Sequence, residues 1–167
     1  MRYKKGFTLI EMLAVIVILG LVMAIAIPVI SSYIMDSRKK TYVATAKEYI
    51  SIASNLIAKQ ELIVRNTDTV YYIHIDNLIT ETKKDSSPFG KWSDAYVLVT
   101  IDPSTKNLTY YWTSADVEGY RIDITKDSAL NKDNVYLSNN KVIDTSIVVD
   151  GKTKIVIYDK NGNKISS

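Results

Sequence analysis

The chain has 167 residues and no cysteine. A length of roughly 100–200 residues corresponds to one globular domain. The lack of cysteine excludes disulfide bridges, thiolate metal sites and cysteine nucleophiles. The net charge of +3 equals the contribution of Arg2, Lys4 and Lys5, so the rest of the chain is neutral overall. A neutral body is not expected to bind nucleic acid in general, because phosphate binding requires a clustered basic face.

A long apolar segment follows the basic start. Residues 12–30 carry no charge, and counting from Phe7 gives 24 residues. As a helix these residues measure about 36 Å, enough to cross a hydrocarbon core of roughly 30 Å. A buried helix of a soluble domain would show a polar face, and a secretory signal peptide would end at a small-residue cleavage site. Neither feature is found, and a plain membrane anchor leaves Glu11 unexplained.

The stretch KKGFTLIEMLAVIVILGLVMAIAIP closely resembles the N-terminus of type IV pilins and pseudopilins. In that family a short basic leader ends in glycine before Phe-Thr-Leu-Ile-Glu and an apolar helix. The resemblance implies that a prepilin peptidase removes the leader 1–6 by cutting between Gly6 and Phe7, and that the new amino group of Phe7 is N-methylated. The short leader and the phenylalanine start are similar to the type IVa subclass. The resemblance also places Gly20 and Pro28 where this family has helix-weakening residues.

Glu11 is expected to have a partner, because a lone carboxylate in an apolar membrane segment costs about 2.5–3.5 kcal/mol. In one interpretation Glu11 reaches the lipid headgroups and the positive start of the helix. In the other it pairs with the amino group of Phe7 on a neighbouring subunit, which neutralises both charges and fixes the stagger between subunits. Gly20 and Pro28 also allow two interpretations: an ordinary kink of a membrane helix, or a weak segment that extends when helices repack from bilayer to filament.

The pattern after residue 30 predicts that the helix continues. Apolar residues recur at spacings of three and four and form one stripe of an amphipathic helix; they are Val43, Ala46, Ile50, Ala53 and Ile57. We expect one helix from about Phe7 to Glu61. Its residues 7–30 would lie in the membrane or the filament core, and its residues 31–61 would form an amphipathic half packed on a sheet.

The residues after the helix predict a loop region over 62–94 and an antiparallel β-sheet domain over 95–167. Strands are predicted at residues 95–101, 108–114, 120–125, 145–149 and 154–158. Asp150-Gly151 is expected to be the type I′ turn of a hairpin, and Asn161-Gly162 a second turn. The fold class is therefore α+β, with a long N-terminal α-helix packed on a C-terminal antiparallel β-sheet. This is the pilin fold that the resemblance implies.

No catalytic motif is found in the sequence, so we predict no enzyme, no cofactor and no metal site. His74 alternates with Ile73 and Ile75 and is interpreted as the outward residue of a short strand. The stretch DKNGNK has the composition of a calcium loop but lacks the EF-hand spacing, so we interpret it as a turn. Four tyrosines are expected to form cross-strand pairs in the sheet: Tyr71, Tyr72, Tyr110 and Tyr111.

The resemblance predicts a structural subunit, a pilin that polymerises with copies of itself and with other pilins into a type IV pilus. Such filaments serve adhesion, motility or biofilm formation. The further partners are prepilin peptidase, the pilus assembly machinery and the cytoplasmic membrane, which the chain crosses once, with its C-terminal domain outside, before it joins an extracellular filament. Two alternatives stay open: a minor pilin or pseudopilin of a competence or secretion apparatus, and a membrane-anchored surface binding domain whose N-terminus only resembles a prepilin.

Overall fold

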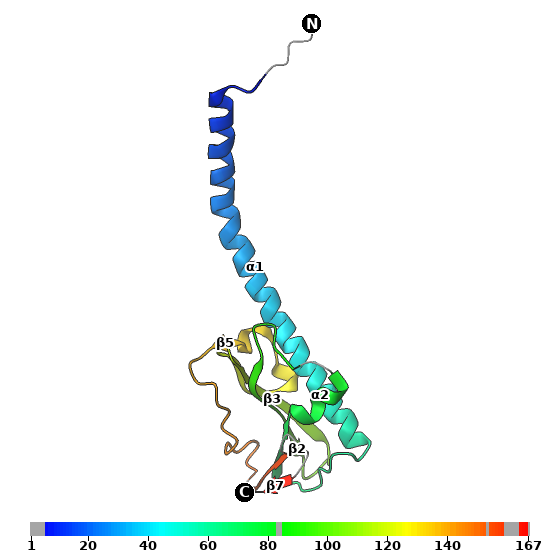
Figure 1. Cartoon of the computed structure of the whole chain (residues 1–167). Coiled ribbons are helices and arrows are strands. Elements are labelled where there is room, and N and C mark those ends of the chain that lie inside the picture. The colour runs from blue at the N-terminus through cyan, green and yellow to red at the C-terminus, as the bar shows by residue number, and fades with distance from the viewer. Residues whose placement is uncertain (1–5, 83–84, 153, 159–163, 167) are drawn as a thin grey trace. The chain divides into compact units, whose positions relative to one another are not determined.

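The computed structural model describes residues 6–82, 85–152, 154–158 and 164–166 (Figure 1). The chain divides into two compact units, Met1–Ser37 and Arg38–Ser167. The helix α1 (Leu9–Ala58) has residues in both units.

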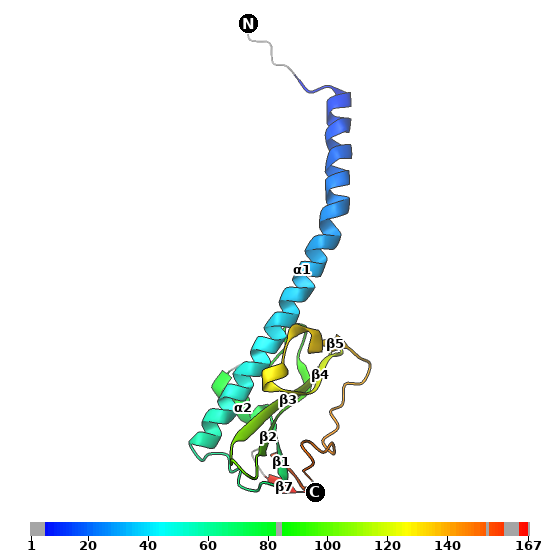
Figure 2. The same cartoon turned by 180° about the vertical axis from the view of Figure 1, so that it is seen from behind.

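The second unit is built on a seven-stranded sheet with the strand order β5-β4-β3-β2-β1-β6-β7 (Figure 2). The strands are β1 (Thr69–His74), β2 (Trp92–Ile101), β3 (Leu108–Asp116), β4 (Tyr120–Lys126), β5 (Tyr136–Leu137), β6 (Lys154–Tyr158) and β7 (Lys164–Ser166). Between them lie α2 (Asp76–Thr82) and two short 3-10 helices, η1 (Asp127–Ala129) and η2 (Lys132–Asn134). The predicted fold class is confirmed: the chain is α+β, with a long helix packed on a mostly antiparallel sheet.

The sheet departs from the sequence prediction at β1. Residues 62–94 were expected to be a loop region with a short strand at His74, and they supply the six-residue strand β1 and also α2. β1 pairs antiparallel with β2 and parallel with β6, so the sheet is not purely antiparallel. The parallel pair arises because the chain crosses from β5, at one edge of the sheet, to the far side of β1 before it forms β6.

The strand predicted at residues 145–149 is wrong, because these residues form no strand in the structure. The turn after them has the expected geometry: Asp150 and Gly151 have φ angles of +54° and +68°, and the Lys152 amide donates to the Val149 carbonyl over 3.1 Å. It joins an irregular segment to β6, so it is a turn of the expected kind without a hairpin. The Asn161-Gly162 turn lies outside the described residues.

One face of the sheet is covered by the second half of α1. The predicted stripe is buried at Val43, Ala46, Ile50 and Ala53, and two fully buried tyrosines extend it. The Tyr49 ring stacks on Trp112 with ring centres 5.5 Å apart, and the Tyr42 ring meets Trp92 edge-on at 5.0 Å. Large aromatic side chains bury 150–250 Å² each, so these contacts fix the helix on the sheet.

The other face of the sheet is covered by residues 138–152, here named the strap. Beneath it lies a second apolar cluster, formed by Val70, Tyr72, Leu98, Tyr111 and Val149. Side chains of the sheet donate hydrogen bonds to backbone carbonyls of the strap: Arg121 Nη1 to Asn140 (2.9 Å), Ser93 Oγ to Lys141 (3.3 Å) and Tyr72 Oη to Ile147 (2.9 Å). The strap is therefore attached largely through its backbone.

Asp150 closes the strap against the sheet. Its Oδ2 accepts hydrogen bonds from the Tyr111 hydroxyl at 2.5 Å and from Thr100 Oγ1 at 3.1 Å. Nearby, the Nζ of the buried Lys152 donates to the Ile101 carbonyl over 3.1 Å. Asp150 and Lys152, the residues on either side of Gly151, therefore both bind the sheet through their side chains. Gly151 itself has one of the two positive φ angles of the turn.

The four tyrosines lie in cross-strand pairs, as predicted, but their partners are aliphatic residues of β2 and not one another. Tyr72 and Tyr111 each lie opposite Leu98 of β2, and Tyr71 and Tyr110 each lie opposite Val99. Three of them instead use their hydroxyl groups to hold backbone or loop segments. Tyr72 and Tyr111 bind the strap, and the Tyr71 hydroxyl accepts from the amides of Arg65 and Asn66 at 3.1 and 2.9 Å. The tyrosines do not pair with one another because the central strand β2 separates β1 from β3.

We predict that Tyr111→Phe lowers the free energy of unfolding by about 1.5–3 kcal/mol, the usual worth of a hydrogen bond to a charged group. The neighbouring Tyr110→Phe is the matched control, because the Tyr110 hydroxyl makes no hydrogen bond within the described residues. Urea unfolding of the full chain in detergent measures both. Equal losses in the two variants would show that Asp150 does not hold the strap.

The pH dependence of stability provides a second prediction. Burial raises the pKa of Tyr72 to about 12, and burial together with the Asp150 hydrogen bond raises the pKa of Tyr111 to about 12. An unfolded tyrosine ionises near pH 10, so the unfolded chain loses these protons first. The free energy of unfolding should therefore fall as pH rises from about 10 to 12.

Ultraviolet absorbance of tyrosinate measures this titration directly. We expect part of the tyrosine signal to appear well above pH 10 in the folded chain and to shrink in Tyr72→Phe. A single transition near pH 10 for every tyrosine would contradict the burial described above.

Candidate functional site

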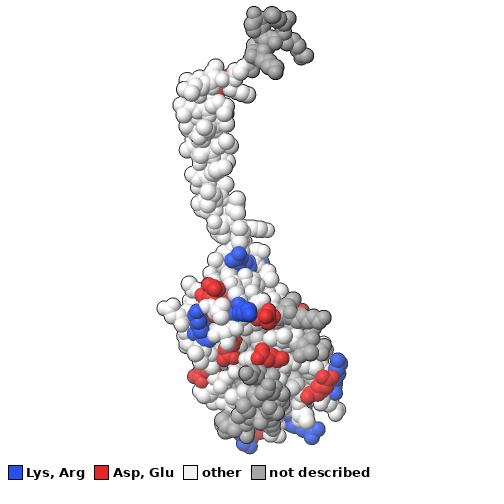
Figure 3. Space-filling view, viewed as in Figure 1, with Lys and Arg blue, Asp and Glu red and all other residues white. Residues whose placement is uncertain are grey.

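The first unit presents an apolar surface that no other described part of the chain covers. Phe7 is 83 % exposed and Leu9 is 90 % exposed, and the large apolar side chains up to Met35 are exposed on all sides of the helix. In Figure 3 this part of the chain is white apart from acidic atoms at its start. Such a surface requires lipid or protein to cover it.

Among the described helices, α1 is the one long and apolar enough to cross a membrane, by length and composition. Its most apolar window of 18 residues has a mean hydropathy of 3.1 and is 0 % buried. A core helix of a soluble protein can be equally apolar, but such a helix is mostly buried. The exposure of this window therefore distinguishes it from a core helix.

The helix begins with a capping box formed by Thr8 and Glu11. Glu11 Oε2 accepts from the Thr8 amide at 2.7 Å and from the Thr8 hydroxyl at 2.8 Å, and the Glu11 amide donates to Thr8 Oγ1 at 3.3 Å. A Thr and a Glu three residues apart satisfy each other's backbone amides in this way at helix starts. The sequence interpretation missed this motif, although the letters TLIE show its spacing.

The predicted processing residues lie next to this capping box. Gly6 and Phe7 precede the helix, and both are exposed. No atom lies within 4 Å of the position that a side chain on Gly6 would occupy. The structure therefore brings Gly6, Phe7 and Glu11 together at the helix start and leaves the bond between Gly6 and Phe7 accessible.

Gly20 and Pro28 lie farther along α1, within regular helix. No atom lies within 4 Å of the position that a side chain on Gly20 would occupy. Pro28 has no amide hydrogen, so the carbonyl of Ala24 receives no helical hydrogen bond. Just beyond, Ser31 Oγ donates to the Ile27 carbonyl at 3.0 Å. In the single chain, then, neither residue interrupts the helix.

His74 has a structural role in the second unit. It ends β1, its Nδ1 accepts from the Asp76 amide at 3.2 Å, and its Nε2 lies 3.3 Å from Asp94 Oδ1. Within the described residues no group of three or more His, Cys, Asp or Glu is placed to hold a metal ion. The calcium-like stretch DKNGNK falls mostly at residues 159–163, which lie outside the described residues.

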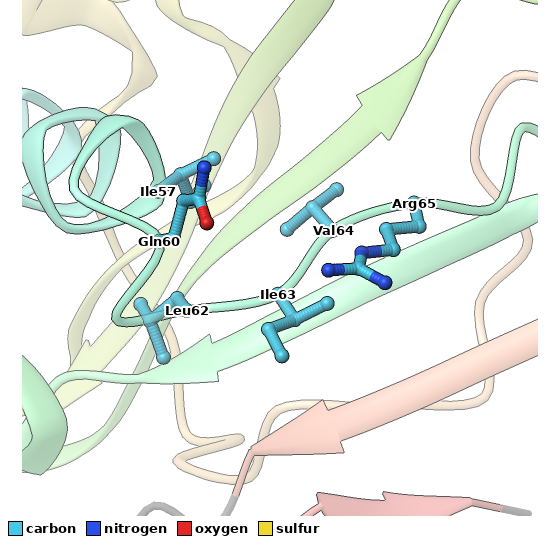
Figure 4. A pocket seen from close by; sticks show the side chains of 6 residues that line it. All are labelled: Ile57, Gln60, Leu62, Ile63, Val64 and Arg65. Carbon is cyan, nitrogen blue, oxygen red and sulfur yellow. The ribbon is translucent and has the colours of Figure 1, made fainter.

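A small recess lies where the chain turns after α1 (Figure 4). It is lined by Ile57, Gln60, Leu62, Ile63, Val64 and Arg65 and has a volume of about 170 Å³. Small-molecule sites usually measure about 300–1,000 Å³ and combine apolar walls with convergent polar groups. This recess is smaller, and most of its side chains are aliphatic, so it is not a candidate for catalysis.

Residues 1–27 match the family profile described as "Prokaryotic N-terminal methylation motif". This motif is the hallmark of type IV pilin and prepilin-like proteins, so the resemblance found in the sequence is confirmed. No solved structure matches the chain.

The chain thus has the N-terminus of a type IV pilin-like or pseudopilin-like precursor, a structural and not an enzymatic class. The motif implies processing by prepilin peptidase and assembly with other pilins. Together with the long apolar helix, it fits a membrane-anchored precursor of a surface filament.

We predict that Thr8→Ala weakens the start of α1 by about 0.5–2 kcal/mol, the usual cost of losing an N-cap side chain. Amide hydrogen exchange of the full chain in detergent should become faster at Glu11, whose amide donates to Thr8 Oγ1, and at Met12, whose amide donates to the Thr8 carbonyl. Thr8→Ser, which keeps the hydroxyl, is the matched control and should exchange as the natural chain does. Unchanged exchange in Thr8→Ala would contradict the capping box.

Proposed function

We propose that this chain is a type IV pilin, a structural subunit that polymerises through α1 into a surface filament serving adhesion, motility or biofilm formation. The observation that carries the proposal is the methylation motif of residues 1–27 on a helix whose apolar side chains are exposed on every side. A membrane covers that surface before assembly, and neighbouring α1 helices cover it in the filament.

In this proposal prepilin peptidase removes the leader 1–6 and leaves Phe7 as the methylated N-terminal residue. Residues 1–5 of that leader lie outside the described residues. The exposure of Gly6 and Phe7 supports the proposal, because a protease needs access to the bond between them. Residues 7–30 then serve as the membrane and filament-core segment, and residues 31–61 as the amphipathic half that carries the sheet domain.

Glu11 has a proposed partner in each of two states. In the single chain, both hydrogen bonds from Thr8 reach Glu11 Oε2, and Glu11 Oε1 has no bond within the described residues. A carboxylate offers about four acceptor positions on its two oxygens. The amino group of Phe7 on a neighbouring subunit can therefore bind Oε1 while the capping box stays intact. This geometry reconciles the two interpretations of Glu11 drawn from the sequence.

Gly20 and Pro28 are proposed to mark a segment that extends on assembly. The helix there is regular in the single chain, but glycine and proline are the residues least favourable to a helix interior, by about 1 and 3 kcal/mol relative to alanine. Contacts among neighbouring helices therefore need to supply little free energy to convert this segment from helix to extended chain.

The proposal is tested by N-terminal sequencing and mass spectrometry of filaments sheared from the surface of the producing cells. We expect the chain to begin at methylated Phe7. A surface filament that contains the chain with Met1–Gly6 still attached would overturn the proposal.

A pair of variants tests the assembly step. Glu11→Gln removes the charge that binds the neighbouring amine, so we expect a several-fold loss of sheared filament with an unchanged amount of chain in the membrane. Glu61→Gln, the same change at an exposed position after α1, is the control and should assemble normally. Normal filament yield from Glu11→Gln would contradict the proposed pairing.

A further inference from the structure

One end of the second unit exposes two aliphatic side chains next to the start of its helix. Val117 lies in the turn between β3 and β4 and is 44 % exposed, and Leu137 lies in β5 and is 65 % exposed. Most other large apolar side chains of this unit are buried or half-buried. Figure 2 places β5 at this end of the sheet.

Direct contacts connect these side chains to the first residue of the unit. The Arg38 guanidinium lies 6.0 Å from the centre of the Phe89 ring, and Phe89 stacks on Tyr120 at 3.7 Å. The adjoining glycines complete the connection: Val117 packs against Gly90, and Leu137 packs against Gly119. Val117 and Leu137 therefore belong to the same end of the unit as Arg38.

The chain itself keeps this end near the apolar segment. Arg38 follows three positions after Met35, the last apolar residue before the charged stretch. A polypeptide reaches at most about 3.6 Å per residue, so Arg38 lies within about 11 Å of Met35 whatever the orientation of the two units. When the apolar segment crosses a bilayer, this end of the second unit is thus held at the headgroup layer.

The charge at this end suits an anionic surface. Arg38, Lys39 and Lys40 of α1 are basic, and Lys141 of the strap donates from Nζ to the Val117 carbonyl. Asp36 and Glu118 oppose them, whereas Asp116 is buried and accepts a hydrogen bond from Ser87 within the unit. Basic side chains beside exposed aliphatic ones are typical of protein surfaces that bind lipid headgroups.

We propose that this end of the second unit, centred on Val117 and Leu137, docks on the anionic headgroup surface of the membrane before the chain enters a filament. The proposal rests on the proposed function only in that residues 7–30 must be inserted in the bilayer. The two aliphatic side chains enter the headgroup region, and the basic side chains contact lipid phosphate. Assembly into a filament would then require two steps: the second unit leaves the membrane surface, and residues 7–30 leave the bilayer.

The test uses the full chain in nanodiscs that hold one copy each. Because the natural chain has no cysteine, Leu137→Cys and Val117→Cys each give a single thiol for an environment-sensitive fluorophore. Thr105→Cys is the matched control, because it lies in the exposed turn at the opposite end of β2, about 30 Å along the strand. Lipids with a spin label on the headgroup serve as the quencher.

We expect several-fold stronger quenching at positions 117 and 137 than at position 105 in discs that contain phosphatidylglycerol. Replacing that lipid with phosphatidylcholine should reduce the quenching, and so should adding Lys141→Gln to the Leu137→Cys chain. Equal quenching at all three positions would overturn the proposal. Quenching of the same strength with phosphatidylglycerol and with phosphatidylcholine would overturn it too.

Two further outcomes separate this proposal from others. Quenching seen only in discs with several copies would identify a second copy of the chain as the occupant and overturn the membrane assignment. Flotation of the chain with vesicles checks insertion independently, and a chain that does not float would overturn both this proposal and the proposed function. A chain that floats and shows the expected quenching but forms no filament would contradict the proposed function alone.

Discussion

The structure depends on one constraint: the first half of α1 has an apolar surface that the chain cannot bury. In the second unit α1 pairs each apolar position of its stripe with the sheet, and aromatic side chains such as Tyr49 and Trp112 fill the interface. Before Arg38, no described residue of the chain covers the apolar side chains of the helix. The hydrophobic effect therefore favours covering this surface with a bilayer or with neighbouring helices. In the proposed function this is the physical basis of a subunit that exists in two environments.

The capping box at the start of α1 supplies hydrogen bonds to Glu11, the one charged side chain between Phe7 and Met35. A carboxylate in an apolar layer is costly unless it is hydrogen-bonded, and Thr8 supplies two donors to Glu11 within the same turn. Because this arrangement is local, it forms in any environment where the helix forms. The remaining oxygen of Glu11 is an acceptor on an otherwise apolar helix. In the proposed filament it would give helix packing a defined register where shape alone would allow sliding.

The sequence predicts the helix and the main antiparallel strands well, because their signals are local. The stripe from Val43 to Ala53 has a helical period, and the strands that became β2, β3, β4 and β6 are rich in β-branched and aromatic residues. Prediction from the sequence fails where the structure of a segment depends on which distant strands it can pair with. Residues 145–149 have the composition of a strand, but β6 already occupies the free edge of β1, so these residues cross the face of the sheet instead. The processing residues came from the N-terminal motif, whereas the capping partner Thr8 was overlooked although its spacing from Glu11 is visible in the sequence.

The way the strap is attached affects how freely the amino acids on its outward face can be substituted. Arg121, Ser93 and Tyr72 bind carbonyl oxygens of the strap, which every amino acid possesses. The outward side chains of Val142 and Val148 take no part in that attachment and are exposed. Substitutions at such positions leave the anchoring bonds in place, so the chemical character of this face can change from one related chain to another while the sheet beneath it remains the same.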